Sequence, residues 1–357
     1  MRKFVFFLLI FFVVCSVETA DAYDLTARSF GMGGAFTAVA DNIEALLYNP
    51  AGNADSGLVG FDVNGGLTVS DLSKLNKILE LEGKIMNDDV DDLLSEIPDE
   101  LILEGQALVG ARLKRVSLAY NAEISSHTNF NGNDSANVYL NNYNEYILSY
   151  GKELINPPLD LGTFSYGFNV KLINMDRQNY FVEDNNGITI TEQKIDGNSF
   201  GIDFGLLAKV TETLRVGCHF ENVFAPDAFL NGTEKTHEYN TQSWEETSTR
   251  EYQEIVPIDF NSRVGAALYI PVVDLTAAMD IDHLFSDGDQ VLHYGLEKNL
   301  FFDGLSLRAG KMSSSNFDFT TFGFGLNLTG FNLDAAFGSR SDIADDMSVA
   351  LSASMNF

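Results

Sequence analysis

Alternation of apolar and polar residues is the dominant pattern along this chain. It is clearest at the C-terminus, where every second residue is apolar: Met347, Val349, Leu351, Ala353, Met355 and Phe357. Because successive side chains of a strand point to opposite faces, such a segment has one apolar and one polar face. A transmembrane β-barrel needs strands of this kind, with lipid on one side and a polar lumen on the other.

Runs with this alternation recur along the chain, and each one predicts a strand. In one of them the predicted lipid face consists of Phe322, Phe324, Leu326 and Leu328. The runs begin near Leu58, Leu103, Lys114, Tyr143, Leu161, Gly197, Thr213, Ile258, Val272, Gln290, Asp303, Phe317, Phe331 and Met347. The expected fold is therefore all-β, a closed transmembrane antiparallel β-barrel of about 14 strands.

The connections between these runs alternate in length. Long gaps cover 70–102, 125–142, 176–196 and 225–257, and short ones fall near Leu113, 153–160, 210–212 and Pro271. Outer-membrane barrels have short periplasmic turns and long outer loops, with both termini in the periplasm when the strand count is even. All the long gaps are then predicted to lie on the outer side.

Two of the predicted outer loops have features of their own. Apolar residues at helical spacing predict short amphipathic helices over 71–102, a range rich in acidic residues. Residues 225–256 are also acidic and contain the only tryptophan, Trp244. Both are interpreted as solvated acidic loops, and the alternative is a surface for a substrate or a protein partner.

The N-terminus has the features of an export signal. Arg2 and Lys3 precede an apolar stretch, and Ala20-Asp21-Ala22 offers a cleavage site. No later segment reaches about 18 consecutive apolar residues, so no membrane-spanning helix is expected. The expected organisation is a signal peptide over 1–22, a hatch or plug over 23–57 and an outer-membrane barrel over 58–357.

Composition narrows the classes of function. The formal net charge is −29, from 51 acidic and 22 basic residues, which argues against a nucleic-acid partner. The hydrophobic content of 45% argues against a disordered chain. One cysteine, Cys218, remains after the expected cleavage, so a disulfide within the mature chain and a cysteine-based metal site are excluded. No cofactor is predicted.

A glycine-rich segment, SFGMGGAFTAVADNIEALLYNPAG, occupies residues 29–52 before the first predicted strand. Asp41 is expected to cap a short helix that runs to Tyr48 and ends at Pro50, because proline restricts the residue before it. The glycines permit close contact with other structure and, at the end, a chain reversal. The predicted hatch motif consists of Gly31, Gly33, Gly34, Asp41, Asn49, Pro50, Ala51 and Gly52.

This motif resembles the start of the FadL/TodX superfamily of outer-membrane transport proteins, which includes PorV-like and TraF-like relatives. G-x-G-G-A over 31–35, A-D over 40–41 and Y-N-P-A-G over 48–52 follow in the order typical of that superfamily. The resemblance implies a fourteen-stranded outer-membrane barrel with an N-terminal hatch. It also implies passive transport of hydrophobic or amphipathic small molecules.

A second function stays open within the same resemblance. PorV-like and TraF-like barrels imply a protein-secretion or surface-attachment factor that works through its outer loops, and the acidic segment 71–102 favours that branch. The partners expected are therefore outer-membrane lipid and either a hydrophobic small molecule or a protein.

Charged residues on the polar face of the predicted strands are expected to point into the lumen. On the lipid face an Arg or Lys would cost roughly 2–4 kcal/mol. The candidates for lumen or ligand contacts are Lys171, Arg215, His219, Glu221, Arg263 and Arg308. Their default role is a salt-bridged network that fills the lumen, and the alternative is an arginine that binds a carboxylate-bearing ligand.

Two patterns that can carry chemistry are interpreted as structural. Gly197–Gly201 matches G-x-S-x-G, but a nucleophile elbow needs a strand-to-helix turn and this match opens a predicted strand. His283 and His293, with Asp280 and Asp282, have the residue types of a metal site, yet they fall where polar lumen residues are expected. Neither an enzyme nor a metal site is predicted.

Overall fold

The computed structural model describes residues 24–54, 57–70, 100–131, 135–154, 162–184, 188–240, 243–286, 288–315, 317–340 and 346–357. The helical elements within them are α2 (Ala27–Gly31), α3 (Ala45–Tyr48) and the 3-10 helix η1 (Pro50–Ala54). Among these described residues, no helix is long and apolar enough to cross a bilayer.

The strands belong to one sixteen-stranded sheet. They are β1 (Val59–Val69), β2 (Glu100–Leu113), β3 (Val116–Asn131), β4 (Ser135–Leu154), β5 (Thr163–Asp184), β6 (Ile188–Lys209), β7 (Leu214–Phe224), β8 (Ala228–Asn240), β9 (Ser243–Val256), β10 (Asn261–Ile270), β11 (Leu275–Asp282), β12 (Val291–Leu300), β13 (Leu305–Ser313), β14 (Asp318–Asn327), β15 (Phe331–Arg340) and β16 (Met347–Asn356).

Fourteen of these strands close an antiparallel barrel, which confirms the predicted fold class. Strands β1 to β7 and β10 to β16 follow one another around the ring, with β7 paired to β10 and β16 paired to β1. The closing pair is in regular register, since Gly60 lies opposite Asn356 and Val69 lies opposite Met347. Closure removes the free edges that an open sheet would have.

The remaining strands, β8 and β9, form a hairpin in the connection between β7 and β10. β8 pairs with the outer half of β6, and β9 pairs with β8. The prediction of a solvated acidic loop over 225–256 is therefore wrong, because most of this segment forms strands. Polar residues occupy both faces of much of this hairpin, so it lacks the apolar alternation that marks a lipid-facing strand.

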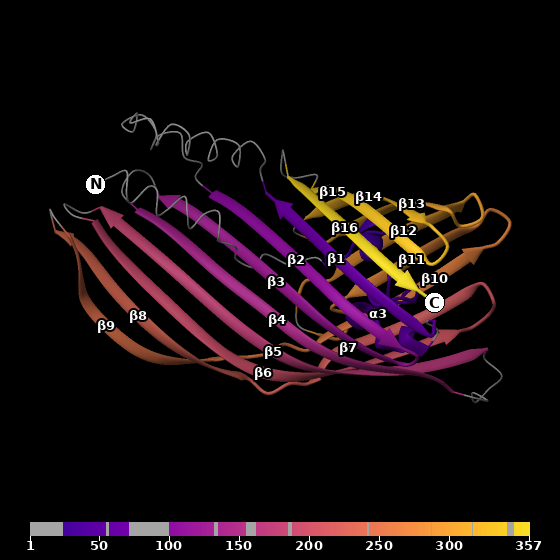
Figure 1. Ribbon diagram of the computed structural model, residues 1–357, viewed down its shortest axis with the longest axis horizontal. Helices are drawn as coiled ribbons and strands as arrows, with labels where there is room; N and C mark the ends of the chain where they lie inside the picture. The colour runs from indigo at the N-terminus through magenta and orange to yellow at the C-terminus, as the bar shows by residue number, and fades with distance from the viewer. Residues whose placement is uncertain are drawn as a thin grey trace.

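Two other predicted outer loops are also strands. Of residues 125–142, the described ones fall on the end of β3 (up to 131) and the start of β4 (from 135). Of residues 176–196, the described ones fall on the end of β5 (up to 184) and the start of β6 (from 188). Strands β4, β5 and β6 have 20, 22 and 22 residues and extend far beyond the rest of the barrel (Figure 1). We call their outer halves, together with the β8–β9 hairpin that pairs with β6, the extended wall. Helices were expected over 71–102. Residues 71–99 of this segment lie outside the described residues, and residues 100–102 belong to β2 instead of a helix.

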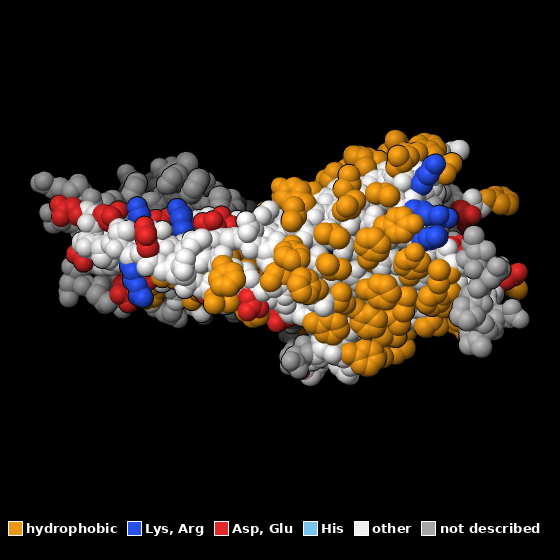
Figure 2. All heavy atoms as spheres, turned by 90° about the horizontal axis from the view of Figure 1, so that it is seen from below, with side chains coloured by type: hydrophobic (Ala, Val, Ile, Leu, Met, Phe, Trp, Pro, Cys, Tyr) orange, Lys and Arg blue, Asp and Glu red, His pale blue; other side chains and the backbone are white. Residues whose placement is uncertain are grey.

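Apolar side chains form a belt on the outside of the barrel. The predicted lipid face of β14 is exposed, with Phe322 62% and Phe324 44% accessible. Figure 2 shows apolar side chains gathered over the barrel half of one face and charged side chains on the extended wall. Monomeric soluble proteins rarely expose so continuous an apolar surface, whereas a barrel in lipid requires one.

The core lies where residues 24–54 fill the lumen. Phe36 and Tyr48 are fully buried there and pack edge to face, with ring centroids 5.4 Å apart. They cluster with wall residues such as Leu207 and Ala278. We call residues 24–54 the hatch.

The helix inside the hatch is shorter than predicted. It ends at Tyr48 as expected, but it begins at Ala45, and no side chain caps it. Asn42 accepts a hydrogen bond from the Glu44 nitrogen at 3.1 Å, which holds this stretch as a turn. Asp41 does not cap the helix because its carboxylate pairs with Arg28 instead.

Candidate functional site

The hatch is pressed against the backbone of the barrel wall. Gly33 has a φ of +63°, and a Cβ there would lie 2.5 Å from the Lys311 nitrogen. From the other side, a Cβ at Gly310 would lie 2.1 Å from the Gly33 nitrogen. Contacts this short exclude any side chain, so both glycines are needed for the hatch to seat.

Inward-facing glycines of the wall make room for the hatch nearly all round the ring. At each of them a Cβ would lie within 3.1 Å of a hatch atom. They are Gly66, Gly110, Gly151, Gly167, Gly205, Gly217, Gly265, Gly295, Gly310, Gly323 and Gly338. Sequence reasoning did not single out this set. The available signal was a glycine on the polar face of one predicted strand after another.

Asn49, in the Asn49-Pro50-Ala51 turn, forms hydrogen bonds both within the hatch and with the barrel wall. Asn49 is fully buried, and its Nδ2 donates to the backbone oxygens of Thr37 and Leu206, both at 3.0 Å. Its Oδ1 accepts from the Ala51 nitrogen at 3.1 Å. Gly52 lies inside η1, where a Cβ would be 2.2 Å from the Ala40 oxygen, so it serves close packing rather than a reversal.

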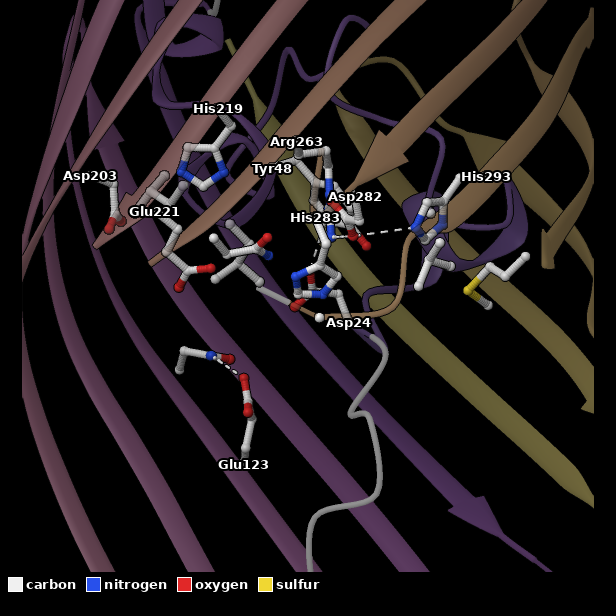
Figure 3. A pocket seen from close by; sticks show the side chains of 18 of the residues that line it. Asp24, Tyr48, Glu123, Asp203, His219, Glu221, Arg263, Asp282, His283 and His293 are labelled. Carbon is white, nitrogen blue, oxygen red and sulfur yellow. Dashed lines mark hydrogen bonds and ion pairs between the residues drawn. The ribbon is translucent and has the colours of Figure 1, made fainter. Parts of the chain in front are cut away.

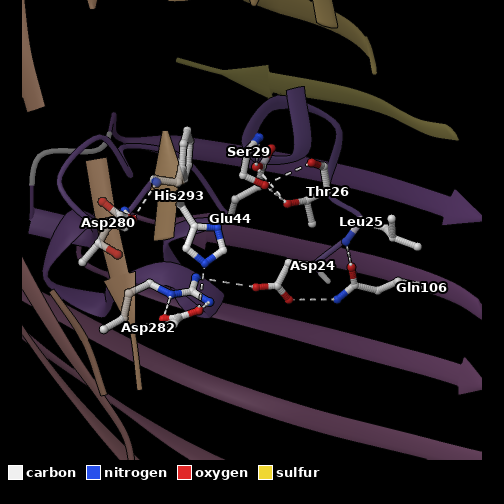
Figure 4. A network of polar contacts seen from close by, with 12 residues as sticks. Asp24, Leu25, Thr26, Ser29, Glu44, Gln106, Asp280, Asp282 and His293 are labelled. Atoms are coloured by element: carbon white, nitrogen blue, oxygen red, sulfur yellow. Dashed lines mark hydrogen bonds and ion pairs between the residues drawn. The ribbon is translucent and has the colours of Figure 1, made fainter. Parts of the chain in front are cut away.

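Buried carboxylates bind the backbone of the hatch (Figure 4). Asp280, from β11, accepts from the Phe36 and Thr37 nitrogens, both at 2.8 Å. Within the hatch, Glu44 accepts from the Ser29 nitrogen at 3.1 Å and from the Thr26 hydroxyl at 3.0 Å. Burial raises the pKa of Glu44, and the charge of Arg28 opposes that rise.

An arginine pair fastens the other side of the hatch. The guanidinium of Arg28 donates to both oxygens of Glu297, each at 2.9 Å. Arg308 donates to the same Glu297 at 2.6 Å and to Asp334 at 2.7 Å. Arg308, predicted as a lumen or ligand contact, therefore lies in a salt-bridged network with the hatch.

The hatch separates two cavities in the lumen. One has a volume of about 440 Å³, lies on the side of the extended wall, and has Leu46, Leu47 and Tyr48 of the hatch in its lining. The other has about 270 Å³, lies on the side of the C-terminus, and has Arg28 and Asp41 of the hatch in its lining. We call them the outer cavity and the inner cavity.

The outer cavity is polar and rich in acidic groups (Figure 3). The acids among the described residues that line it are Asp24, Glu123, Glu145, Asp203, Glu221, Asp282 and Asp289. The bases are Lys171 and Arg263, and the histidines are His219, His283 and His293. This lining differs from the apolar pocket expected for a hydrophobic solute.

Lys171 lies at the centre of a buried charge cluster. Its side chain is 2% exposed, and its Nζ lies within 3.2 Å of three carboxylates from three neighbouring strands, those of Glu145, Asp203 and Glu221. One ammonium is thus shared by three carboxyl groups. Lys171 and Glu221 both line the outer cavity.

Arg263 links the wall to the hatch. Its guanidinium donates to both carboxylate oxygens of Asp282 and lies 4.8 Å from the centre of the Tyr48 ring. Its Nη1 is 4.0 Å from Asp24 of the hatch. Arg263 thus lies in a network of charged groups between the wall and the hatch.

The two remaining lumen candidates differ from each other. His219 is 4% exposed and lines the outer cavity, and its Nε2 has no hydrogen-bond partner among the described residues. Arg215 lies four residues before His219 on β7, but it lines neither of the two cavities.

Side chains of the G-x-S-x-G match and of the histidine–aspartate group form hydrogen bonds to the backbone. Ser199 lies within β6, and its hydroxyl donates to the Pro226 oxygen at 2.6 Å. His293 donates from Nδ1 to the Gly33 oxygen at 2.8 Å, which helps to hold the hatch. Among the described residues, no cluster of three or more His, Cys, Asp or Glu side chains is arranged to hold a metal ion.

Comparison with known proteins identifies the fold. No protein-family model and no curated protein matches the chain. Among solved structures, the CymD monoaromatic hydrocarbon channel matches with a TM-score of 0.61 and 12% identity, over 94% of this chain and 99% of that one. The chain has the FadL/TodX fold. The toluene transporter TbuX of Ralstonia pickettii has a TM-score of 0.60 and 12% identity, over 94% of this chain and 100% of its own.

A FadL homologue of Pseudomonas aeruginosa has a TM-score of 0.61 and 11% identity, over 96% of this chain and 100% of its own. The FadL/TodX fold that the hatch motif implied is thus confirmed over nearly the whole chain. At such identities the likeness concerns the fold, and function has to be argued from the lumen.

Proposed function

We propose that this protein is an outer-membrane channel for the passive transport of an amphipathic small molecule, with the hatch as its gate. The observation that carries the proposal is the position of the hatch between two cavities inside a barrel with an apolar outer belt. A solute that crosses the lumen has to pass the hatch, and the hatch therefore has to move.

Two further observations support a location in the outer membrane. The apolar belt suits a bilayer, and residues 1–22 have the pattern of an export signal. The solved structures with this fold carry the names hydrocarbon channel and toluene transporter. The polar lining of the outer cavity favours a solute with a polar group as well as an apolar one.

A disulfide between hatch and wall tests the gate. A Cβ at Gly31 would lie 3.5 Å from the Cβ of Ala336 on β15, within the roughly 3.5–4.5 Å range of disulfides. We would combine Gly31→Cys and Ala336→Cys with Cys218→Ser, which removes the competing thiol. The protein would be reconstituted in liposomes, with uptake measured for phenylalkyl trimethylammonium and phenylalkyl sulfonate, which cross bare lipid slowly.

The proposal predicts that oxidation stops the uptake of whichever solute enters and that reduction restores it. The variant with Gly31→Cys and Cys218→Ser alone serves as the control, since it carries the same hatch change and forms no link. Full uptake through the oxidised, linked protein would refute a moving hatch.

The extended wall supports a second candidate function, contact with a protein partner. Within the described part of the chain, β9 pairs only with β8, so its other edge offers backbone groups to an added strand. A secretion or attachment role predicts a partner that co-purifies in stoichiometric amount with the full chain but not with a chain lacking residues 228–256. Equal recovery from both chains would argue against it.

A further inference from the structure

The outer cavity is lined by more acidic side chains than basic ones. Seven acidic side chains and two basic ones line it. Lys171 is already shared by three carboxylates, and Arg263 is engaged by Asp282. Glu123 accepts only from amide groups, with Asn121 Nδ2 at 2.8 Å, and no base among the described residues forms an ion pair with it. This cavity therefore favours a cation.

An unpartnered buried group independently indicates a ligand. His219 is 4% exposed, and Figure 3 shows its ring beside Glu221 and facing the cavity. Its Nε2 has no hydrogen-bond partner among the described residues. Buried polar atoms of folded proteins are nearly always paired, so an occupant that supplies a hydrogen bond would complete this site.

The floor of the same cavity is apolar. Leu46, Leu47 and Tyr48 of the hatch line it, together with Ile147 of β4. Acidic groups from Glu123, Asp203 and Glu221 surround this patch from the wall. A ligand that matches both parts has a protonated amine and a compact apolar group, and a volume of about 440 Å³ accommodates such a molecule.

We propose that the outer cavity binds an organic cation, a protonated amine carried on a short apolar group. The amine would lie among the carboxylates near Glu123 and Glu221, donate to Nε2 of His219, and place its apolar part on the hatch. This assignment rests on the proposed transport function, because it names the class of solute that would wait above the gate.

Binding of three matched solutes tests the proposal separately from transport. We would titrate 2-phenylethylammonium, 2-phenylethanol and 3-phenylpropanoate into the full mature chain in lipid nanodiscs, and subtract the heat of empty nanodiscs. The ammonium is expected to bind at least tenfold more tightly than the alcohol, and the carboxylate not to bind. Equal affinity for all three, or preference for the carboxylate, would overturn the proposal.

Variants locate the binding. Glu123→Gln keeps the Lys171 cluster intact and is expected to weaken ammonium binding several-fold, with no change for the alcohol. His219→Leu should weaken it as well, because the acceptor is lost. Glu246→Gln on β9, outside the cavity, is the control and should change nothing. If Glu123→Gln and His219→Leu, shown to be folded by heat-modifiable gel mobility, bind the ammonium as tightly as the control, the assignment is wrong.

The two proposals fail in different ways. Loss of uptake on oxidation, together with equal binding of all three solutes, would leave the gate standing and remove the cation site. Selective binding of the ammonium with unchanged uptake through the linked hatch would do the reverse.

Discussion

Arg28 of the hatch and Glu297 of β12 face each other as a fork, with the two guanidinium nitrogens Nε and Nη2 each 2.9 Å from a carboxylate oxygen. The side chains are 19% and 6% exposed, so water screens the pair weakly. Two parallel hydrogen bonds fix orientation as well as distance. This pair therefore fastens the hatch to the wall.

Glu297→Gln should loosen the hatch. The change leaves the charge of Arg28 with Asp41 alone, and breaking a buried ion pair costs about 3–5 kcal/mol. Amide hydrogens of residues 27–48 are then expected to exchange with solvent at least ~100-fold faster. Glu254→Gln is the control, because its partner Arg177 forms an exposed pair on the extended wall. Unchanged exchange in Glu297→Gln would show that the pair does not hold the hatch.

Gly33→Ala should unseat the hatch. A Cβ there would lie 2.5 Å from the Lys311 nitrogen, and the φ of +63° disfavours any L side chain. Strain of this kind costs on the order of 1–3 kcal/mol, before the clash is counted. Gly65→Ala is a matched control, since the nearest atom to its Cβ is 3.9 Å away. Limited proteolysis of the folded barrel should cleave the hatch of Gly33→Ala sooner than the hatch of Gly65→Ala. Equal resistance of the two variants would contradict close packing of the hatch against the wall.

Docking of the hatch should weaken as the pH rises from acid to neutral. Burial raises the pKa of Glu44, with the charge of Arg28 opposing, so the folded state favours the protonated carboxyl. Its contribution to stability is fully present below the usual carboxyl pKa and is lost as the pH rises through the raised pKa. Glu44→Gln should flatten this dependence. Hydrogen exchange of the hatch across a pH series, corrected for intrinsic rates, measures it, and identical slopes for both chains would exclude Glu44 as the cause.

Removal of the β8–β9 hairpin should leave the barrel closed. β7 and β10 pair directly, beginning with Glu221 opposite Asn261, so a short loop can replace residues 228–256. The belt residues are untouched by this deletion. The shortened chain is expected to keep heat-modifiable gel mobility and an unfolding temperature close to that of the full chain. Failure to form the barrel would mean that the hairpin is part of its folding core.

Alternation in the sequence predicted the lipid-facing parts of the fold. Strands β15 and β16 begin at the predicted Phe331 and Met347, and the exposed Phe322 and Phe324 lie on the predicted face. The signal is strong there because lipid and lumen impose opposite requirements on neighbouring residues. Beyond the belt both faces of a strand meet water, so the outer half of β6 and the β8–β9 hairpin carried no such signal.

The lumen was predictable by residue type but not by partner. Alternation placed Lys171, Glu221 and Arg263 inside, whereas the cluster around Lys171 draws carboxylates from strands that are distant in sequence. The wall glycines that contact the hatch were missed for a similar reason. The need for Gly310 appears only once Gly33 of the hatch lies against it.

The most direct test of the account asks which surface meets lipid. Trp244 is the only tryptophan, so both reporters carry Trp244→Phe. Ser248→Trp, at an exposed position of β9, then reports on the extended wall, and Phe322→Trp reports on the belt. Both would be reconstituted in bilayers whose acyl chains carry bromine, which quenches tryptophan on contact. Strong quenching at position 322 and little at position 248 is the predicted result. Equal quenching at the two positions would contradict a belt embedded in lipid and a wall that stands in water.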